Sequence, residues 1–244
     1  MVFCAILWEE WIVFKRQFKQ ITASALISPL MYMLAFGWGL GNNITVNGLP
    51  YIYFIVPGII ALTTMNTSYS AVAVLLNIHR LYDKTFEQYL IAPIPIYFLT
   101  LGKITAGMLR GMYSGTIILL IAWIFGVHIH LTPMFILIMA LNGLTFASLG
   151  FFAAMVVNSH AEMNRFSTFA ITPMTFICGT FFSLDNLPYA VKIFIDILPL
   201  TQVSTALRTI ASGGVVNPRN VIVLFMYFVA LFLLSIRSCY KVNA

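Results

Sequence analysis

Charged side chains are scarce in this sequence of 244 residues. Asp, Glu, Lys and Arg make up only 8% of the chain, whereas hydrophobic types make up 61%. Soluble domains carry about 25% charged residues, so this chain has too little charge to cover a water-soluble surface, and we expect lipid to solvate most of it. The net charge of +6 does not indicate a nucleic-acid partner, because the basic residues flank apolar runs and form no stripe with interleaved aromatics.

Cysteine and metal-ligating patterns are also scarce. Cys4, Cys178 and Cys239 are far apart in the sequence and form no CxxC or Cys/His spacing. We therefore predict free thiols and no disulfide framework. His128 and His130 are close enough to share a metal ion, but two ligands rarely make a site, so no metal is expected. The apolar runs carry no carboxylate in their interior, and no catalytic residue is predicted.

Long apolar runs dominate what remains. A helix rises 1.5 Å per residue, so about 20 apolar residues cross a hydrocarbon core of roughly 30 Å. The sequence predicts an all-α integral membrane protein, one transmembrane domain over residues 1–244, with six transmembrane helices. The predicted spans are Ile21–Leu40, Tyr51–Leu76, Leu101–Phe125, Thr132–Val157, Phe166–Phe182 and Asn220–Ile236.

The basic residues beside these runs predict the orientation of the chain. Ten of the 13 Lys and Arg residues fall on one side of this topology, and only Lys192, Arg208 and Arg219 fall on the other. Positive charge accumulates on the cytoplasmic side of membrane proteins. We therefore expect both termini to be cytoplasmic.

Two segments outside the spans have amphipathic patterns. Residues 1–20 carry apolar side chains at helical spacing, and most of the charged residues fall on another face; the charged residues are Glu9, Glu10, Lys15, Arg16 and Lys19. This pattern predicts an interfacial helix that docks on the membrane or on a cytoplasmic partner. Residues 183–218 contain two short apolar stripes joined at Pro199. Each stripe is too short to cross the membrane, which favours an external re-entrant hairpin. A lid without a role in transport is the alternative.

Residues 77–95 hold the densest mixed charge in the chain. Phe86 and Tyr89 share one helical face, Asp83 and Glu87 share another, and prolines end the pattern. The spacing predicts a short amphipathic helix on the cytoplasmic side. A solvated loop with one lipid-facing side is the alternative.

Small and polar residues mark the insides of the spans. Gly107, Gly111 and Gly115 form a small-xxx-small series, which favours close helix packing within one subunit over a dimer seam. Arg110 lies in the cytoplasmic half of the same span, from which it can snorkel to water. Hydroxyl and amide side chains within a span either face a polar cavity or form hydrogen bonds with the backbone of their own helix. The candidate pathway-lining residues are Thr64, Asn66, Thr67, Thr172 and Thr175.

Two longer motifs carry a family resemblance over nearly the whole chain. The first is the stretch 86–94 (FEQYLIAPI), followed by Leu101-Gly102-Lys103-Ile104. The second is the stretch 179–188 (GTFFSLDNLP), followed by the segments 198–201 (LPLT) and 206–208 (ALR). Together they resemble the permeases of the ABC-2 type transporter family, most closely its nodulation-factor and daunorubicin-type exporters.

The resemblance implies a half-transporter in a bacterial inner membrane. Two copies of a separate ATP-binding subunit would carry ATP and Mg, with no cofactor on this chain, and a second permease, expected to be identical, would complete the assembly. This chain has no P-loop of its own, because Ile104 follows its only Gly-Lys pair, where Ser or Thr is needed. The resemblance places the ATPase contact, with its aromatic rings filling a cleft on the partner, at Arg80, Asp83, Lys84, Phe86, Glu87 and Tyr89.

The sequence-based hypothesis is a permease subunit of an ATP-driven exporter. Its cargo would be amphiphilic, such as a lipid-linked saccharide, a lipid or a drug, since proton or sodium carriers usually bury ionisable groups at mid-membrane. Membrane lipid would surround it. Two alternatives stay open, a membrane scaffold that recruits an ATPase without moving cargo, and an intramembrane enzyme.

Overall fold

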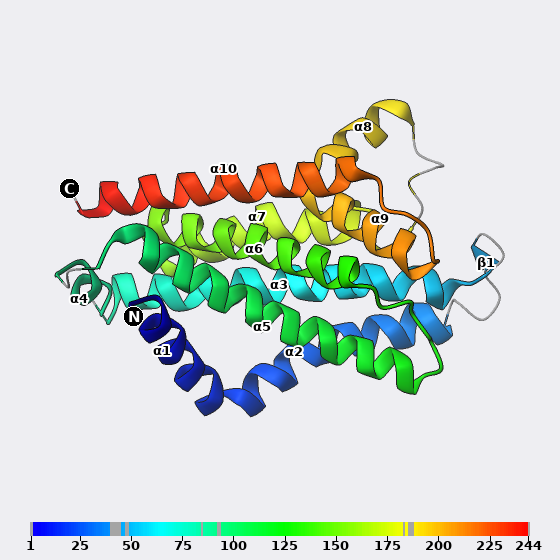
Figure 1. The fold of residues 1–244 in the computed structure, drawn as a ribbon, viewed down its shortest axis with the longest axis horizontal. Helices are drawn as coiled ribbons and strands as arrows, with labels where there is room; N and C mark the ends of the chain where they lie inside the picture. The colour runs from blue at the N-terminus through cyan, green and yellow to red at the C-terminus, as the bar shows by residue number, and fades with distance from the viewer. Residues whose placement is uncertain are drawn as a thin grey trace.

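The computed structural model describes residues 2–39, 45–46, 49–83, 85–91, 94–182, 184 and 188–243. These residues are almost entirely helical and form an elongated bundle, in which α4 and the end of α10 lie at the same end (Figure 1). A two-residue antiparallel pairing joins β1 (Thr45–Val46) to β2 (Leu49–Pro50). The helices are α1 (Val2–Arg16), α2 (Phe18–Tyr32), the π-helix η1 (Met33–Gly39), α3 (Tyr51–Leu81), α4 (Thr85–Ile91), α5 (Ile96–Ile124), α6 (Pro133–Val156), α7 (His160–Ile177), α8 (Tyr189–Ile197), α9 (Pro199–Ala211) and α10 (Pro218–Asn243).

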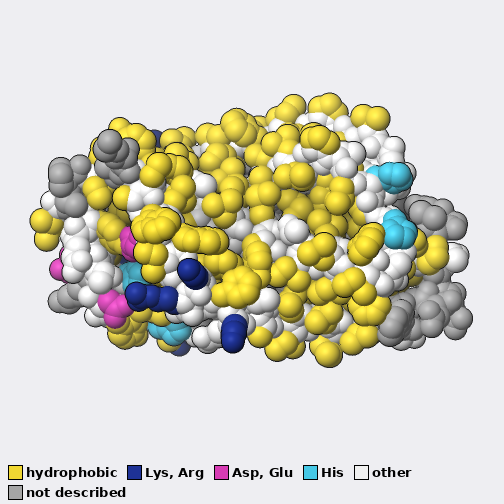
Figure 2. Space-filling view, turned by 60° about the horizontal axis from the view of Figure 1, so that its bottom comes forward, with side chains coloured by type: hydrophobic (Ala, Val, Ile, Leu, Met, Phe, Trp, Pro, Cys, Tyr) yellow, Lys and Arg dark blue, Asp and Glu magenta, His cyan; other side chains and the backbone are white. Residues whose placement is uncertain are grey.

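Four helices within the described ranges, α3, α5, α6 and α10, are long and apolar enough to cross a membrane. They coincide with the second, third, fourth and sixth predicted spans. The pair α8 and α9 adds a fifth crossing if it is one broken span, because the two helices bend by 92° at their junction. Figure 2 shows the resulting surface, with hydrophobic side chains along the body and charged side chains gathered toward one end. The multi-pass all-helical architecture is therefore confirmed, at four to five spans.

The first and fifth predicted spans have a less regular structure. The first corresponds to α2 and η1, where Pro29 lies inside the helix and the helix type changes at Met33. The fifth corresponds to α7, which has 18 residues and begins earlier than predicted. Its start is fixed by a reciprocal cap, because the Ser159 hydroxyl accepts from the Glu162 backbone N–H and the Glu162 carboxylate accepts from that of Asn158. Six spans remain a prediction.

The glycine series of α5 lies where this helix packs against α3 and α6. A Cβ at Gly107 would lie 2.5 Å from Val72 of α3 and 3.0 Å from Ala147 of α6. A Cβ at Gly111 would lie 1.9 Å from the Ser68 hydroxyl oxygen. The position of Gly115 is similar, with Met139 at 2.5 Å. The absence of side chains thus brings three helices of one chain into backbone-level contact.

The segment before the last span forms two helices, α8 and α9, which meet at Leu198 and Pro199 as the sequence pattern predicts. Arg208 attaches α9 to the bundle, because its Nε donates to the Phe54 carbonyl at 2.9 Å and its Nη2 donates to the Thr180 carbonyl at 2.7 Å. The chain leaves α9 through Gly213, whose φ of +78° favours glycine. The predicted hairpin starts at residue 183, and residues 183 and 185–187 lie outside the described part.

Replacing Gly111 with Ala tests the packing of α5 on α3. The new methyl group would collide with Ser68 and with the Thr64 carbonyl, at 1.9 and 2.7 Å. We expect overpacking to lower stability by about 1–3 kcal/mol, measured as a lower thermal unfolding midpoint in detergent. The matched control is Gly39→Ala, whose methyl group would meet only the Leu34 carbonyl, at 3.7 Å. Equal unfolding midpoints for the two variants would contradict this account of the α5 packing.

Candidate functional site: a buried charge cluster beside a polar cavity

Two cations are buried on one face of α5. Lys103 and Arg110 are 5% and 7% exposed, and they are seven positions apart, which is about two helical turns. Removing a cation from water costs several kcal/mol unless an anion and hydrogen bonds compensate it. α5 itself supplies no carboxylate. The compensation must come from another element.

Glu10 of α1 supplies this compensation with a single carboxylate. Its Oε1 lies 2.7 Å from Lys103 Nζ, and its Oε2 lies 2.8 Å from Arg110 Nη2. The same Arg110 nitrogen also donates to the Glu10 backbone carbonyl at 3.2 Å. Glu10 is 7% exposed, so this bridge is shielded from water. This pair of ionic contacts holds α1 against α5 at Lys103 and Arg110.

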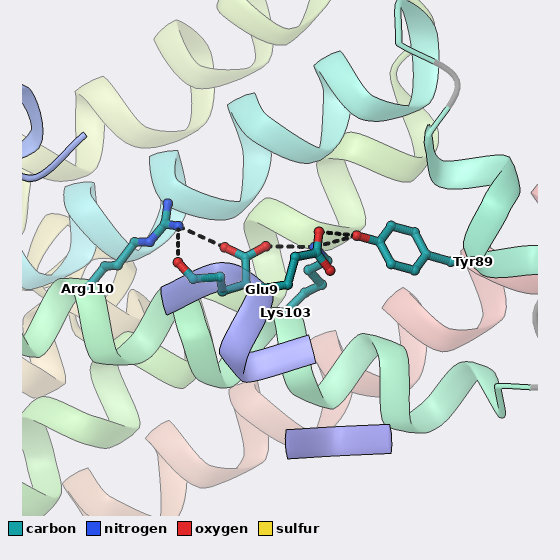
Figure 3. Close-up of polar contacts among 5 residues, drawn as sticks. Glu9, Tyr89, Lys103 and Arg110 are labelled. Carbon is teal, nitrogen blue, oxygen red and sulfur yellow. Dashed lines mark hydrogen bonds and ion pairs between the residues drawn. The ribbon is translucent and has the colours of Figure 1, made fainter. Parts of the chain in front are cut away.

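Tyr89 of α4 joins the other end of the cluster (Figure 3). Its hydroxyl donates to the Glu9 carboxylate, and Lys103 Nζ lies 3.3 Å from the same hydroxyl and 3.4 Å from Glu9 Oε1. The Lys103 ammonium also lies 4.9 Å from the centroid of the Tyr89 ring, a cation–π distance. Burial raises the pKa of Tyr89 to about 12, and the Glu9 carboxylate adds to the rise while Lys103 opposes it. Tyr89 is therefore a neutral donor at physiological pH.

The shape of α1 explains why Glu10 reaches α5. Ile6, Glu10 and Phe14 are buried at spacings of four residues and form one helical face. Ile6 packs against Gly102, where a Cβ would be 2.8 Å away, and the Phe14 ring meets the Tyr113 ring edge-on at 5.2 Å. The predicted N-terminal helix is present. The expectation that its acidic residues lie on the polar face is wrong for Glu10, which occupies the buried face.

The Arg110 environment also differs from expectation. We expected this side chain to snorkel to water, but the structure places it against Glu10 with 7% exposure. The two residues are 100 positions apart in the sequence. Lys103, for which the sequence predicted no ion pair, is equally buried. Sequence spacing carries no signal for such a long-range pair.

The residues that the resemblance assigned to the ATPase contact divide into two groups. Phe86 is 2% exposed, and the half-buried Tyr89 faces α1, so both rings contact other parts of the chain. Their contact with an ATPase stays a prediction. Arg80 caps the end of α6, since its Nη1 donates to the carbonyls of Ala154 and Met155 at 2.8 and 2.7 Å. The exposed members are Asp83 and Glu87. Lys84 lies outside the described residues.

A cavity of about 650 Å³ lies between α2, α3 and α7, beside the charge cluster. Its wall includes Asn66, Thr67, Thr172 and Thr175, four of the candidate pathway-lining residues. Thr64 is not part of this wall, because it is fully buried against α5, with its hydroxyl 2.6 Å from a Cβ position at Gly115. The other polar lining residues are Gln17, Ser28, Tyr32, Thr63 and Ser70.

Arg110 belongs to both features, because it pairs with Glu10 and also lines the cavity. A continuous set of polar contacts thus runs from Tyr89 on α4, through Glu9, Lys103 and Glu10, to the cavity wall. This arrangement connects the end of the bundle that carries exposed carboxylates to the space where a ligand fits. The chemistry available is binding and charge pairing.

A double-mutant cycle tests the Glu10–Arg110 pair. Glu10→Gln leaves two buried cations short of an anion, so we expect a loss of about 3 kcal/mol in the free energy of unfolding. Glu10→Gln combined with Arg110→Gln removes a cation with the anion and should cost less than the sum of the single changes, by about 1–3 kcal/mol. The exposed change Glu87→Gln is the matched control. Additive effects in thermal unfolding would show that the pair contributes nothing.

Comparisons with known proteins identify the family of this chain. A family model described as "ABC-2 type transporter" matches residues 1–211. The inner membrane transport permease YadH of Escherichia coli K12 is 27% identical over 177 residues, which cover 72% of this chain and 69% of that protein. Nodulation protein J of Rhizobium meliloti strain 1021 is 29% identical over 78% of this chain and 73% of its own. The protein of the same name from Rhizobium leguminosarum bv. trifolii is 28% identical over 93% and 88%. With the family model covering most of its length and its membrane-crossing helices in place, the chain belongs to the ABC-2 type transporter family.

Proposed function

We propose that this protein is the membrane-spanning permease subunit of an ATP-driven exporter in a bacterial inner membrane. Family membership and the names of its relatives, a transport permease among them, support a transport role. The observation that carries the proposal is the set of polar contacts from α4 to Arg110 at the cavity wall. Such contacts suit a protein that transmits motion from one end to a binding space.

The energy source is a separate ATP-binding subunit, present in two copies and carrying ATP and Mg. The Gly102-Lys103 pair of this chain lies inside α5, where Gly102 is packed against Ile6 and Lys103 is paired with Glu10. These residues are unable to cradle a phosphate. The ATPase binds through the exposed Glu87 of α4 and the exposed Asp83 just before this helix, on the cytoplasmic side of the topology that positive charge predicts.

A second copy of the permease closes the cavity. The helices on either side of the cavity expose apolar side chains, with Ile27 and Met31 of α2 at 60% and 57% and Phe169 of α7 at 81%. Thr172, on the same helix as Phe169, lines the cavity and is exposed. A homodimer joined along α2 and α7 encloses two such walls around one pathway. In this arrangement α1 lies at the cytoplasmic interface and α8 with α9 forms the re-entrant hairpin at the external end.

The cargo is amphiphilic, because the cavity wall mixes hydroxyl and amide groups with Leu62, Val74, Leu75 and Phe176. ATP binding moves α4, and Tyr89 passes this motion to α1 and α5 through Glu9 and Lys103. The cavity then opens toward the outside, and the cargo leaves the inner leaflet. A scaffold that only recruits an ATPase needs no such cavity, so the cavity favours transport.

Purification of the tagged full-length chain from its native membrane in a mild detergent tests the assembly. We expect a P-loop ATPase to co-purify in equal amount with the permease, and the complex to hydrolyse ATP. An untagged strain controls for adventitious binding. A permease that purifies without any ATPase would contradict the proposed function.

The charge reversal Glu87→Lys tests the contact at α4. Glu87 is exposed, so the fold should be unaffected, whereas the partner surface should lose a complementary charge. We expect the amount of co-purified ATPase to fall about tenfold, equivalent to 1.4 kcal/mol. The control Val215→Lys introduces the same side chain at a 94% exposed position between α9 and α10. An undiminished yield of ATPase with Glu87→Lys would place the contact elsewhere.

A further inference from the structure

Arg110 has hydrogen-bonding capacity that Glu10 does not use. Both of its bonds to Glu10 come from Nη2. No hydrogen bond from its Nε or Nη1 is present among the described residues. Arg110 is also the only Lys, Arg, Asp or Glu among the described residues that line the cavity. Its positive charge therefore faces a space in which no carboxylate of the described wall balances it.

The Glu10 carboxylate is shared between two buried cations. It contacts Lys103 at 2.7 Å and Arg110 at 2.8 Å, while Glu9, whose side chain is 40% exposed, lies 3.4 Å from Lys103 and toward α4. The Arg110 end of the cluster is thus the end with less negative charge. An anion that enters the cavity next to Arg110 gives this cation a partner that it does not share with Lys103.

The surrounding wall suits an anionic headgroup with an apolar tail. Asn66, Thr67, Ser70 and Thr172 line the cavity, and their side chains form no hydrogen bond with the described part of the chain. Their amide and hydroxyl groups are therefore available to phosphate or carboxylate oxygens. Phe176 and Leu62 provide an apolar surface in the same cavity.

We propose that Arg110 binds the anionic headgroup of an amphiphile in this cavity, in competition with Glu10. The inference deepens the proposed function, because it rests on the cavity being the cargo site and names the chemistry of the cargo. When the headgroup pairs with Arg110 in place of Glu10, Glu10 is paired with Lys103 alone, and the attachment of α1 to α5 weakens. Cargo occupancy is thereby communicated to α1, and through Glu9 to Tyr89 on the ATPase-facing helix.

Binding to the full-length permease alone, in nanodiscs of neutral phosphatidylcholine, tests this inference. The probes are decyl phosphate, decyl maltoside and inorganic phosphate, and the readout is affinity by isothermal titration calorimetry. A charge-assisted bond in a shielded site is equivalent to at least about a tenfold change in affinity. We therefore expect decyl phosphate to bind at least about tenfold more tightly than either other probe.

Three variants separate competition from simple attraction. Glu10→Gln frees Arg110 and should tighten decyl phosphate binding about tenfold. The double variant Glu10→Gln with Arg110→Gln retains a neutral pair, which protects the fold, and should lose the preference for the phosphate. Lys15→Gln removes an exposed cation of α1 as the matched control and should change nothing.

Three results would overturn the inference. They are equal affinity for the charged and uncharged amphiphiles, a phosphate preference that survives in the double variant, or an affinity that Glu10→Gln fails to raise. Inorganic phosphate binding as tightly as decyl phosphate would overturn the assignment to an amphiphile. The measurement requires no ATPase, so its failure is distinguishable from a failure of the co-purification that tests the proposed function.

Discussion

Two buried cations on a membrane-crossing helix determine where α1 and α4 lie in this structure. Lys103 and Arg110 each carry a desolvation cost of several kcal/mol, and the Glu10 carboxylate offsets both. Because Glu10 belongs to α1, this helix has to lie along α5. Because Lys103 also contacts Glu9 and Tyr89, the position of α4 depends on the same cluster. One set of charges thus places α1, which is distant in sequence, together with the consecutive helices α4 and α5.

The bundle beneath this cluster is held differently. α5 packs on α3 and α6 through Gly107, Gly111 and Gly115, with contacts so close that a single methyl group would collide. Such packing favours one rigid arrangement, since dense interiors tolerate few alternatives. The attachments of α1 and α4 rely on polar contacts, which can exchange partners. We therefore expect the α3–α5–α6 core to move as a unit, while α1 and α4 respond to a ligand or to a partner.

Much of the fold was predictable, because long apolar runs identify membrane-crossing helices without knowledge of neighbours. The spans α3, α5, α6 and α10 were predicted on this basis, as was the helix break at Pro199, where proline interrupts the backbone hydrogen bonds. The start of α7 was missed, although Ser159 and Glu162 form a recognisable capping pattern. The first span was harder to predict, because a π-helical segment follows Pro29 there.

The site was predictable only in part. Asn66 and Thr67 do line a cavity, but Thr64 packs against α5. Thr64 lies four residues before Ser68, so the two share the side of α3 that contacts the glycines of α5. The inward direction of Phe86 and Tyr89 had no such signal, because periodicity defines a shared face and not the neighbour that covers it. The Glu10–Arg110 pair spans 100 positions, and a single sequence does not reveal contacts of that range.

The central claim is that one carboxylate positions α1, α4 and α5. Hydrogen–deuterium exchange tests it most directly, with the native full-length permease and the Glu10→Gln variant compared in nanodiscs. If Glu10 holds the cluster together, amide exchange should accelerate in α1 and also in α4, which Glu10 does not itself contact, while α10 should be unchanged. Faster exchange confined to α1, with α4 as protected as in the native chain, would show that the cluster does not connect them and would contradict the account.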